Sequence, residues 1–243
     1  MLILLPPSEG KAAAGHGPAL DPASLSFPSL NEARERVLSA LLALCGGDEE
    51  RARETLTLSP GQSGEVAKNR TLRTAPALPA AELYTGVLYD NLRLGDLPPA
   101  ARRRADEALL VFSGLWGVLR PADRVPPYRL SMGVKLPPLG PLGTFWRPVV
   151  SAALDGSTSL VVDMRSSTYA PAWPPGRRGV SVRVLKGGKV VSHMAKATRG
   201  AVARSLLLAD NTPETPDELA KTLIDLDYDV RLDGRRLDVL LSP

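Results

Sequence analysis

The sequence has little cysteine and histidine: one cysteine, Cys45, and two histidines, His16 and His193, among 243 residues. A single cysteine excludes an intramolecular disulfide and fits a reducing compartment. Zinc sites need three or four such ligands, so we expect no metal site. Cys45 also ends an apolar helical run, which predicts a buried thiol rather than a redox-active one.

Long apolar runs are missing as well. The Leu2–Leu5 run is too short and has no basic leader before it, so it predicts a strand rather than a signal peptide. No other run approaches the roughly 20 residues that a membrane span needs. We therefore expect a cytoplasmic protein with no membrane partner.

The sequence also lacks the GxGxxG, Walker A, GxSxG and HExxH motifs. The first two bind nucleotide cofactors, and the last two carry hydrolytic centres. We therefore expect no cofactor, and the standard hydrolase classes have no support.

The composition is that of a globular protein, with 44% hydrophobic and 23% charged residues and only 5% aromatics. No flexible or charged linker divides the chain, which predicts one domain over residues 1–243. The net charge of +4 and a sequence pI of about 9.4 favour an anionic partner. Of the 30 basic residues 23 are arginines, which suit phosphate, although a GC-rich genome explains them equally well.

Hydrophobic periodicity and turn residues predict an α+β fold: a single compact domain in which a mixed sheet of paired strands has flanking helices. Two hairpins are predicted at Gly187-Gly188 and at Asp233-Gly234. Thr215 with Glu218 predicts a capped helix start. The predicted strands are 2–5, 159–164, 180–185, 189–192, 228–232 and 236–241, and the main predicted helices are 29–44, 48–56, 98–112, 194–210 and 215–226.

The segment from Phe112 to Asp123 is rich in glycine, arginine and proline and has no regular period, which is typical of a loop that shapes a site. One interpretation is a helix-hairpin-helix element near residues 105–123, in which Gly114, Gly117 and Arg120 present donors to a phosphate. The other is that Gly114 caps the preceding helix in the left-handed conformation.

A second basic feature lies on the predicted helix that follows Met194. Lys196, Arg199 and Arg204 fall on one side of it, with Gly200 among them, and the opposite side is apolar. A glycine there lowers helix propensity by about 1 kcal/mol, so it indicates a close approach of either a phosphate or a neighbouring backbone.

Further candidates lie in loops. Ser8 and Lys11 follow the first predicted strand, and loops after strand ends often form sites. Arg129 and Arg165 lie in other loops, where they bind an anion or tie the loops together. For chemistry the candidates are Lys11, Tyr128 and Asp163, with Lys196 as a further nucleophile or base.

Several short motifs occur in one order along the chain: Met1–Ser8, Tyr84–Gly86, Ser113–Pro121, Pro127–Leu130, Phe145-Trp146 and Ala195–Gly200. Together they resemble the YaaA family of bacterial cytoplasmic proteins of the peroxide response. The match extends from residue 1 to about Arg204 and more faintly to the end. The resemblance implies DNA binding, a helix-hairpin-helix element and protection against oxidative stress, but no assigned reaction.

We therefore expect a protein that binds DNA phosphates through a basic cleft, largely without sequence specificity, in the cytoplasmic peroxide response. Recombination or repair proteins are its predicted partners. The alternative is an enzyme that acts on a nucleotide or nucleic-acid substrate in the same cleft. A scaffold without a ligand is a third hypothesis, which requires these polar groups to satisfy one another.

Overall fold

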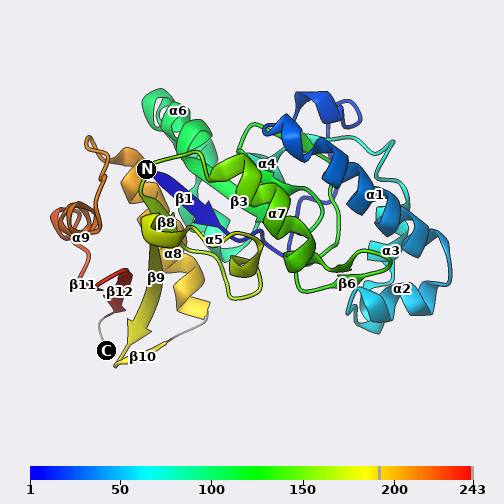
Figure 1. The fold of residues 1–243 in the computed structure, drawn as a ribbon. Coiled ribbons are helices and arrows are strands. Elements are labelled where there is room, and N and C mark those ends of the chain that lie inside the picture. The colour runs from blue at the N-terminus through cyan, green and yellow to red at the C-terminus, as the bar shows by residue number, and fades with distance from the viewer. Residues whose placement is uncertain (191–192, 242–243) are drawn as a thin grey trace.

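The computed structural model describes residues 1–190 and 193–241, and a mixed sheet runs through its middle (Figure 1). Its centre is β1 (Leu2–Leu5), which lies parallel to β3 (Leu109–Ser113) on one side and to β8 (Val161–Asp163) on the other. All three are nearly continuous apolar runs, the pattern of strands covered on both faces. The predicted first strand is confirmed.

Further strands extend this centre on both sides. They are β4 (Gly117–Leu119), β9 (Gly179–Lys186), β10 (Lys189–Val190), β11 (Val230–Asp233) and β12 (Arg236–Leu241). The order across the sheet is β11-β12-β9-β8-β1-β3-β4, and β10 pairs with β9. Strands β12, β9, β8, β1 and β3 are parallel, whereas β4, β10 and β11 are antiparallel to their partners.

Helices surround the sheet, and α1, α2 and α3 pack together beyond its β3–β4 end, away from β11 and β12 (Figure 1). The helix bounds are α1 (Asn31–Gly46), α2 (Glu49–Thr55), α3 (Gly64–Arg70), α4 (Ala80–Leu83), α5 (Val87–Leu92), α6 (Pro99–Ala108), α7 (Leu142–Leu154), α8 (His193–Leu208) and α9 (Pro216–Asp225). Short ladders join β2 (Leu78–Pro79) to β5 (Arg124–Val125) and β6 (Lys135–Leu136) to β7 (Gly140–Pro141).

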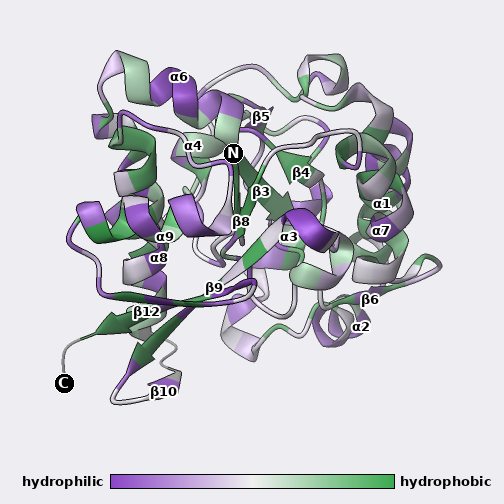
Figure 2. Cartoon of the chain, turned by 60° about the vertical axis from the view of Figure 1, so that its left-hand side comes forward, coloured by the Kyte–Doolittle hydropathy of each residue, from purple (hydrophilic) through white to green (hydrophobic). Residues whose placement is uncertain are grey.

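The predicted mixed α and β architecture, with paired strands and flanking helices, is confirmed. Figure 2 shows the central strands as the apolar middle of the molecule. Both predicted hairpins form, although residues 191 and 192 of the predicted strand 189–192 lie outside the described residues. Gly187, Gly188 and Gly234 adopt the positive φ that their turns require. Thr215 caps α9 by accepting from the Glu218 backbone N–H. No helix among the described residues has the length and hydropathy of a membrane span.

The helix predicted through Phe112 was wrong in its last part. Helix α6 ends at Ala108, and Leu109–Ser113 forms β3, which turns back as β4. Its apolar residues fit a helix face by spacing, but four consecutive apolar side chains are all buried here, as in a central strand.

The helix-hairpin-helix element near residues 105–123 is therefore replaced by a β-hairpin. The alternative interpretation of Gly114 as a helix cap was also wrong, because Gly114 follows a strand. A Cβ at Gly114 would lie 2.6 Å from the Leu130 carbonyl oxygen, so this glycine allows two loops to touch.

Gly200 lets α8 pack closely on α5. A Cβ on residue 200 would lie 2.1 Å from the Leu88 carbonyl oxygen and 3.0 Å from Asn91 Cβ. The sequence predicted a close approach of either a phosphate or a neighbouring backbone at Gly200. The structure shows the backbone of α5 at this position.

Replacing Gly200 by Ala is expected to destabilise the fold by about 3 kcal/mol, because α5 and α8 must move apart to admit the methyl group. Gly64→Ala in α3 is the matched control, since open space surrounds Gly64. Urea unfolding of both variants measures the difference, and equal stabilities would contradict this account of the α5–α8 contact.

Candidate functional site

The carboxyl ends of the three central parallel strands meet at one edge of the sheet. The loop from Pro6 to Lys11 follows β1, Ser113 ends β3, and the segment from Met164 to Tyr169 follows β8. In parallel sheets this edge is where ligands bind. The polar side chains after these strands are therefore brought together by strand pairing.

The larger cavity at this edge has a volume of about 480 Å³. It is lined by the Pro6–Gly10 loop and the start of α5, and α8 contributes two cations, Lys196 and Arg199. The walls carry apolar and hydroxyl groups, from Pro6, Pro7, Ser8, Thr85, Val87, Leu88, Tyr89, Ser131, Ser166, Thr168 and Tyr169. We call this space the main cavity.

Arg199 is an unpaired cation in the wall of the main cavity. Its Nε is buried and has no hydrogen-bond partner in the part of the chain that the structure describes. Burial lowers the pKa of Arg199, and the charge of Asp163 opposes this effect. Lys196, one helical turn earlier, is exposed. These two residues are thus available to an anion.

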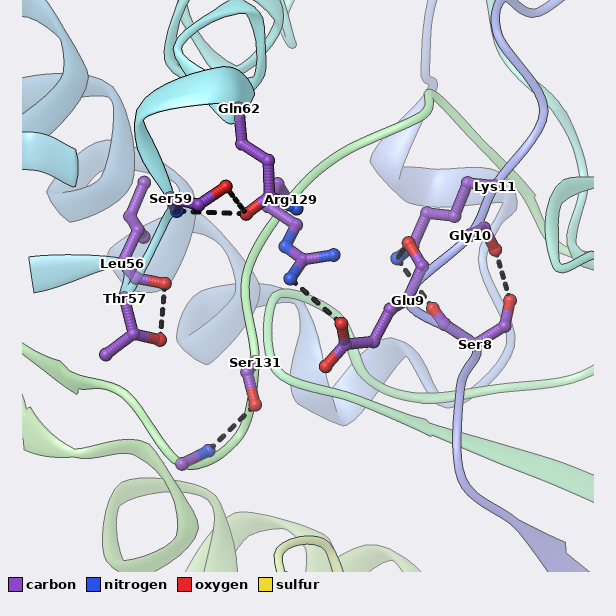
Figure 3. Close-up of polar contacts among 11 residues, drawn as sticks. Ser8, Glu9, Gly10, Lys11, Leu56, Thr57, Ser59, Gln62, Arg129 and Ser131 are labelled. Carbon is purple, nitrogen blue, oxygen red and sulfur yellow. Dashed lines mark hydrogen bonds and ion pairs between the residues drawn. The ribbon is translucent and has the colours of Figure 1, made fainter. Parts of the chain in front are cut away.

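A second cavity of about 360 Å³ lies next to the main cavity, and both have Glu9 and Gly10 in their walls. The other residues of this side cavity are Lys11, Gln62, Glu65, Lys68, Tyr128 and Arg129. Figure 3 shows the Arg129 side chain reaching Glu9, with their atoms 3.0 Å apart, and Lys11 curling back toward Ser8.

Lys11 has an amine held by backbone and aromatic groups. Its Nζ donates to the Ser8 carbonyl oxygen at 2.8 Å and to the Glu9 carbonyl oxygen at 3.4 Å. It also lies 4.7 Å from the centre of the Tyr128 ring and 5.7 Å from that of Tyr84. Burial, followed by the positive charge of Arg129, lowers the pKa of Lys11 to about 8, against smaller opposing effects of Glu65 and Glu9.

A buried chain of hydroxyl groups lies beneath Lys11. Ser113 Oγ accepts from the backbone N–H groups of Leu115 and Trp116, which occupies both of its lone pairs. Its own proton is therefore donated to Tyr128 Oη, 2.7 Å away, and Tyr128 donates in turn to Tyr84 Oη at 3.0 Å. Burial raises the pKa of both tyrosines, so both phenols stay protonated.

Three of the predicted arginines bind other parts of the protein. Arg120 donates to the carbonyl oxygens of Asp106 and Glu107 at the end of α6. Arg204 donates to those of Leu92 and Arg93 at the end of α5.

Arg165 is the third. Its side chain is fully buried, pairs with both Asp163 oxygens at 2.9 and 2.7 Å and donates to the Trp173 carbonyl oxygen. Of the two roles predicted for Arg165, tying loops together is the one that these contacts support. Asp163, predicted as a candidate for chemistry, is the carboxylate of this ion pair.

Gly114 and Gly117, which were predicted to bind phosphate, have packing roles. Gly117 has a φ of +71°, and a Cβ there would lie 2.8 Å from the Trp146 ring. The Gly114 carbonyl oxygen accepts from Trp146 Nε1 at 2.9 Å. Of the predicted site residues, Ser8, Lys11, Tyr128, Arg129, Lys196 and Arg199 lie around the two adjoining cavities.

A sequence profile described as peroxide stress protein YaaA matches residues 1–231. The chain belongs to this family. It is 56% identical to a UPF0246 protein of Streptomyces coelicolor over 96% of this chain and 93% of the relative. It is 42% identical to a UPF0246 protein of Corynebacterium efficiens over 90% of each chain, and 34% identical to an uncharacterized protein of Campylobacter jejuni over 53% of each.

One motif that carries the YaaA resemblance supplies cavity residues that were not predicted as site residues. The triplet Tyr84-Thr85-Gly86 pairs with the loop after β1, as the backbone bridge between Lys11 and Tyr84 shows. Tyr84 is buried beneath Lys11, and Thr85 lines the main cavity. Their position within an ordered set of motifs was the only signal in the sequence.

Gln62 and Glu65 were not predicted. They come from a separate helical segment, far from the other site residues in sequence. No local pattern marks either of them, because their importance depends on long-range packing.

Replacing Lys11 by Met is expected to stabilise this YaaA-family protein at neutral pH by roughly 1–3 kcal/mol, since it removes a poorly solvated charge. The unfolded chain binds more protons than the folded one between the lowered pKa of about 8 and the usual value. Wild-type stability therefore rises with pH through this window, and the advantage of Lys11→Met shrinks.

Urea unfolding on both sides of this window measures the effect. Lys221→Met, at an exposed position of α9, is the matched control and is expected to show no such pH dependence. A Lys11→Met variant that is less stable than the wild type at neutral pH would contradict the desolvation argument.

Proposed function

We propose that this protein acts in the peroxide stress response by binding DNA phosphates at the main cavity, largely without sequence specificity. The family supplies the link to peroxide stress. The observation that carries the proposal is the pair of cations on α8, Lys196 and Arg199, which line the main cavity. Neither forms an ion pair with a carboxylate of the described residues, and Arg199 Nε has no hydrogen-bond partner there. Unpaired cations beside hydroxyl groups favour a phosphate.

Arg129 provides a third cation in the side cavity, next to Glu9, which lines both cavities. Glu9 holds it in an ion pair, but the Glu9 side chain is 81% exposed, so the pair is weak and a phosphate oxygen can replace the carboxylate. The groups involved are charges and hydroxyls at loops and one helix face. Such groups position a backbone but do not distinguish bases.

The contact set is smaller than the sequence suggests. Arg120, Arg165 and Arg204 are bound to internal oxygens, which leaves Lys196, Arg199 and Arg129 as the principal phosphate ligands. Two or three phosphate contacts correspond to a slope of log K against log salt of about −2 to −3. Recombination or repair proteins remain predicted partners.

Titration of duplex DNA across salt concentrations tests this proposal. Lys196→Gln and Arg199→Gln are each expected to weaken binding and to flatten the salt slope by about one phosphate contact. Glu9→Gln is expected to strengthen binding, because it frees Arg129. Lys221→Gln and Arg235→Gln, at exposed positions outside both cavities, are the controls. Unchanged affinity and slope in the Lys196 and Arg199 variants would exclude this surface.

Cys45 is not part of the proposed response. It is fully buried in α1, and burial raises the pKa of its thiol, which disfavours the reactive thiolate. Cys45→Ala is expected to leave peroxide survival intact in cells that contain the folded protein. Loss of survival at normal protein levels would show that the thiol takes part.

An enzyme that acts on a nucleotide or nucleic-acid substrate is the second candidate function. The observation that favours it is Lys11, whose amine is kept near its point of deprotonation at the mouth of the side cavity. DNA binding alone does not require such a group, because a phosphate contact is stronger with a fully charged ammonium.

A further inference from the structure

The charge arrangement of the side cavity leaves Lys11 without a counter-ion. Two carboxylates line this cavity, but Glu9 is paired with Arg129 at 3.0 Å and Glu65 with Lys68 at 2.7 Å. No carboxylate oxygen of the described residues forms an ion pair with Lys11 Nζ. A lysine that only supports the fold is normally solvated or paired, and this amine is neither.

The amine is also held in a fixed position. The carbonyl oxygens of Ser8 and Glu9 accept its protons, and the rings of Tyr84 and Tyr128 form the surface beside it. Tyr128 is itself fixed by Ser113, whose hydroxyl is bound by two backbone N–H groups. A neutral amine uses two protons for the two carbonyl groups and keeps its lone pair free. These are the conditions for a nucleophilic lysine.

The rest of the side cavity suits the anionic part of a small substrate. Arg129 and Lys68 line it together with Gln62, and the exposed Glu9 carboxylate that pairs with Arg129 is readily displaced. The volume of about 360 Å³ accommodates a small phosphorylated molecule.

We propose that Lys11 forms an imine with an aldehyde or ketone that also carries a phosphate or carboxylate group. The lone pair of neutral Nζ attacks the carbonyl carbon, one of the two amine protons passes to a water molecule, and this water returns a proton to the carbonyl oxygen. The resulting carbinolamine loses this oxygen as water, together with the proton remaining on nitrogen, and a C=N bond replaces C=O. No electrons are exchanged with another reagent, so no oxidant or reductant is needed.

This inference rests on the enzyme alternative. It shares Arg129 with the proposed DNA contacts but does not require Lys196 or Arg199. The probe is pyridoxal 5′-phosphate, an aldehyde with a phosphate, followed by borohydride reduction and peptide mapping of the wild-type protein. Lys11 is expected to be labelled at least about tenfold faster than exposed Lys221 near neutral pH, with a midpoint near pH 8. Pyridoxal without the phosphate is expected to need about tenfold higher concentrations.

Variants separate the parts of the proposal. Lys11→Arg is expected to abolish the selective labelling, whereas Lys221→Arg leaves it unchanged. Arg129→Gln is expected to raise the half-saturating concentration of pyridoxal 5′-phosphate several-fold more than that of unphosphorylated pyridoxal. Both probes react more slowly with this variant, because the charge of Arg129 helps to lower the pKa of Lys11. Circular dichroism verifies that each variant is folded. The peptide map of the wild-type protein tests Lys11 labelling even if a variant fails to fold.

Labelling that is equal across the lysines, or that omits Lys11, would overturn the proposal. Equal half-saturating concentrations of pyridoxal 5′-phosphate and pyridoxal would overturn the proposal that the substrate carries an anionic group. DNA titration of the same preparations keeps the two functions distinguishable, because binding through Lys196 and Arg199 is expected whether or not Lys11 reacts.

Discussion

Strand β1 pairs in parallel with β3 and β8, with Ile3 opposite Leu109 on one side and Val162 on the other. This pairing brings the chain segments after three strands to one edge, although they are separated by about a hundred and by fifty residues in sequence. Both cavities are built from these segments, together with α8 and the helical region around Gln62 and Glu65. The site is therefore a product of parallel strand order rather than of any local motif.

Four of the 23 arginines satisfy the ends of helices. Arg70, Arg104, Arg120 and Arg204 each donate to carbonyl oxygens at or near the C-terminus of a helix, those of α1, α8, α6 and α5 respectively. These carbonyl groups have no partner within their own helix and carry partial negative charge. A high arginine content thus overstates the surface available to nucleic acid, since these four side chains are held by helix ends.

Local signals predicted local structure well. The glycine pairs at the two hairpins and Thr215 at the start of α9 act through their own neighbours, so sequence reveals them. Residues 109–112 were predicted as helix because the spacing of the apolar residues also fits a helix face. They form a strand because all four side chains are buried between β1 and β4, which the local sequence does not reveal. Likewise Lys11 was identified from its place after a strand, but its lack of a counter-ion depends on Glu65 and Lys68, which no pattern links to it.

The fold leaves two cations at the carboxyl edge of the sheet poorly compensated. Lys11 has no carboxylate within ion-pair distance in the described chain, and Arg199 Nε has no hydrogen-bond partner there, yet the buried Arg34 and Arg165 are fully supplied with acceptors. Desolvated charge without a partner destabilises a folded protein, so a purely structural role would favour an apolar residue at either position. Both cations line the adjoining cavities at the carboxyl edge. The two proposed functions would each relieve one of these costs, since an anion would compensate Arg199 and imine formation would use the neutral amine of Lys11.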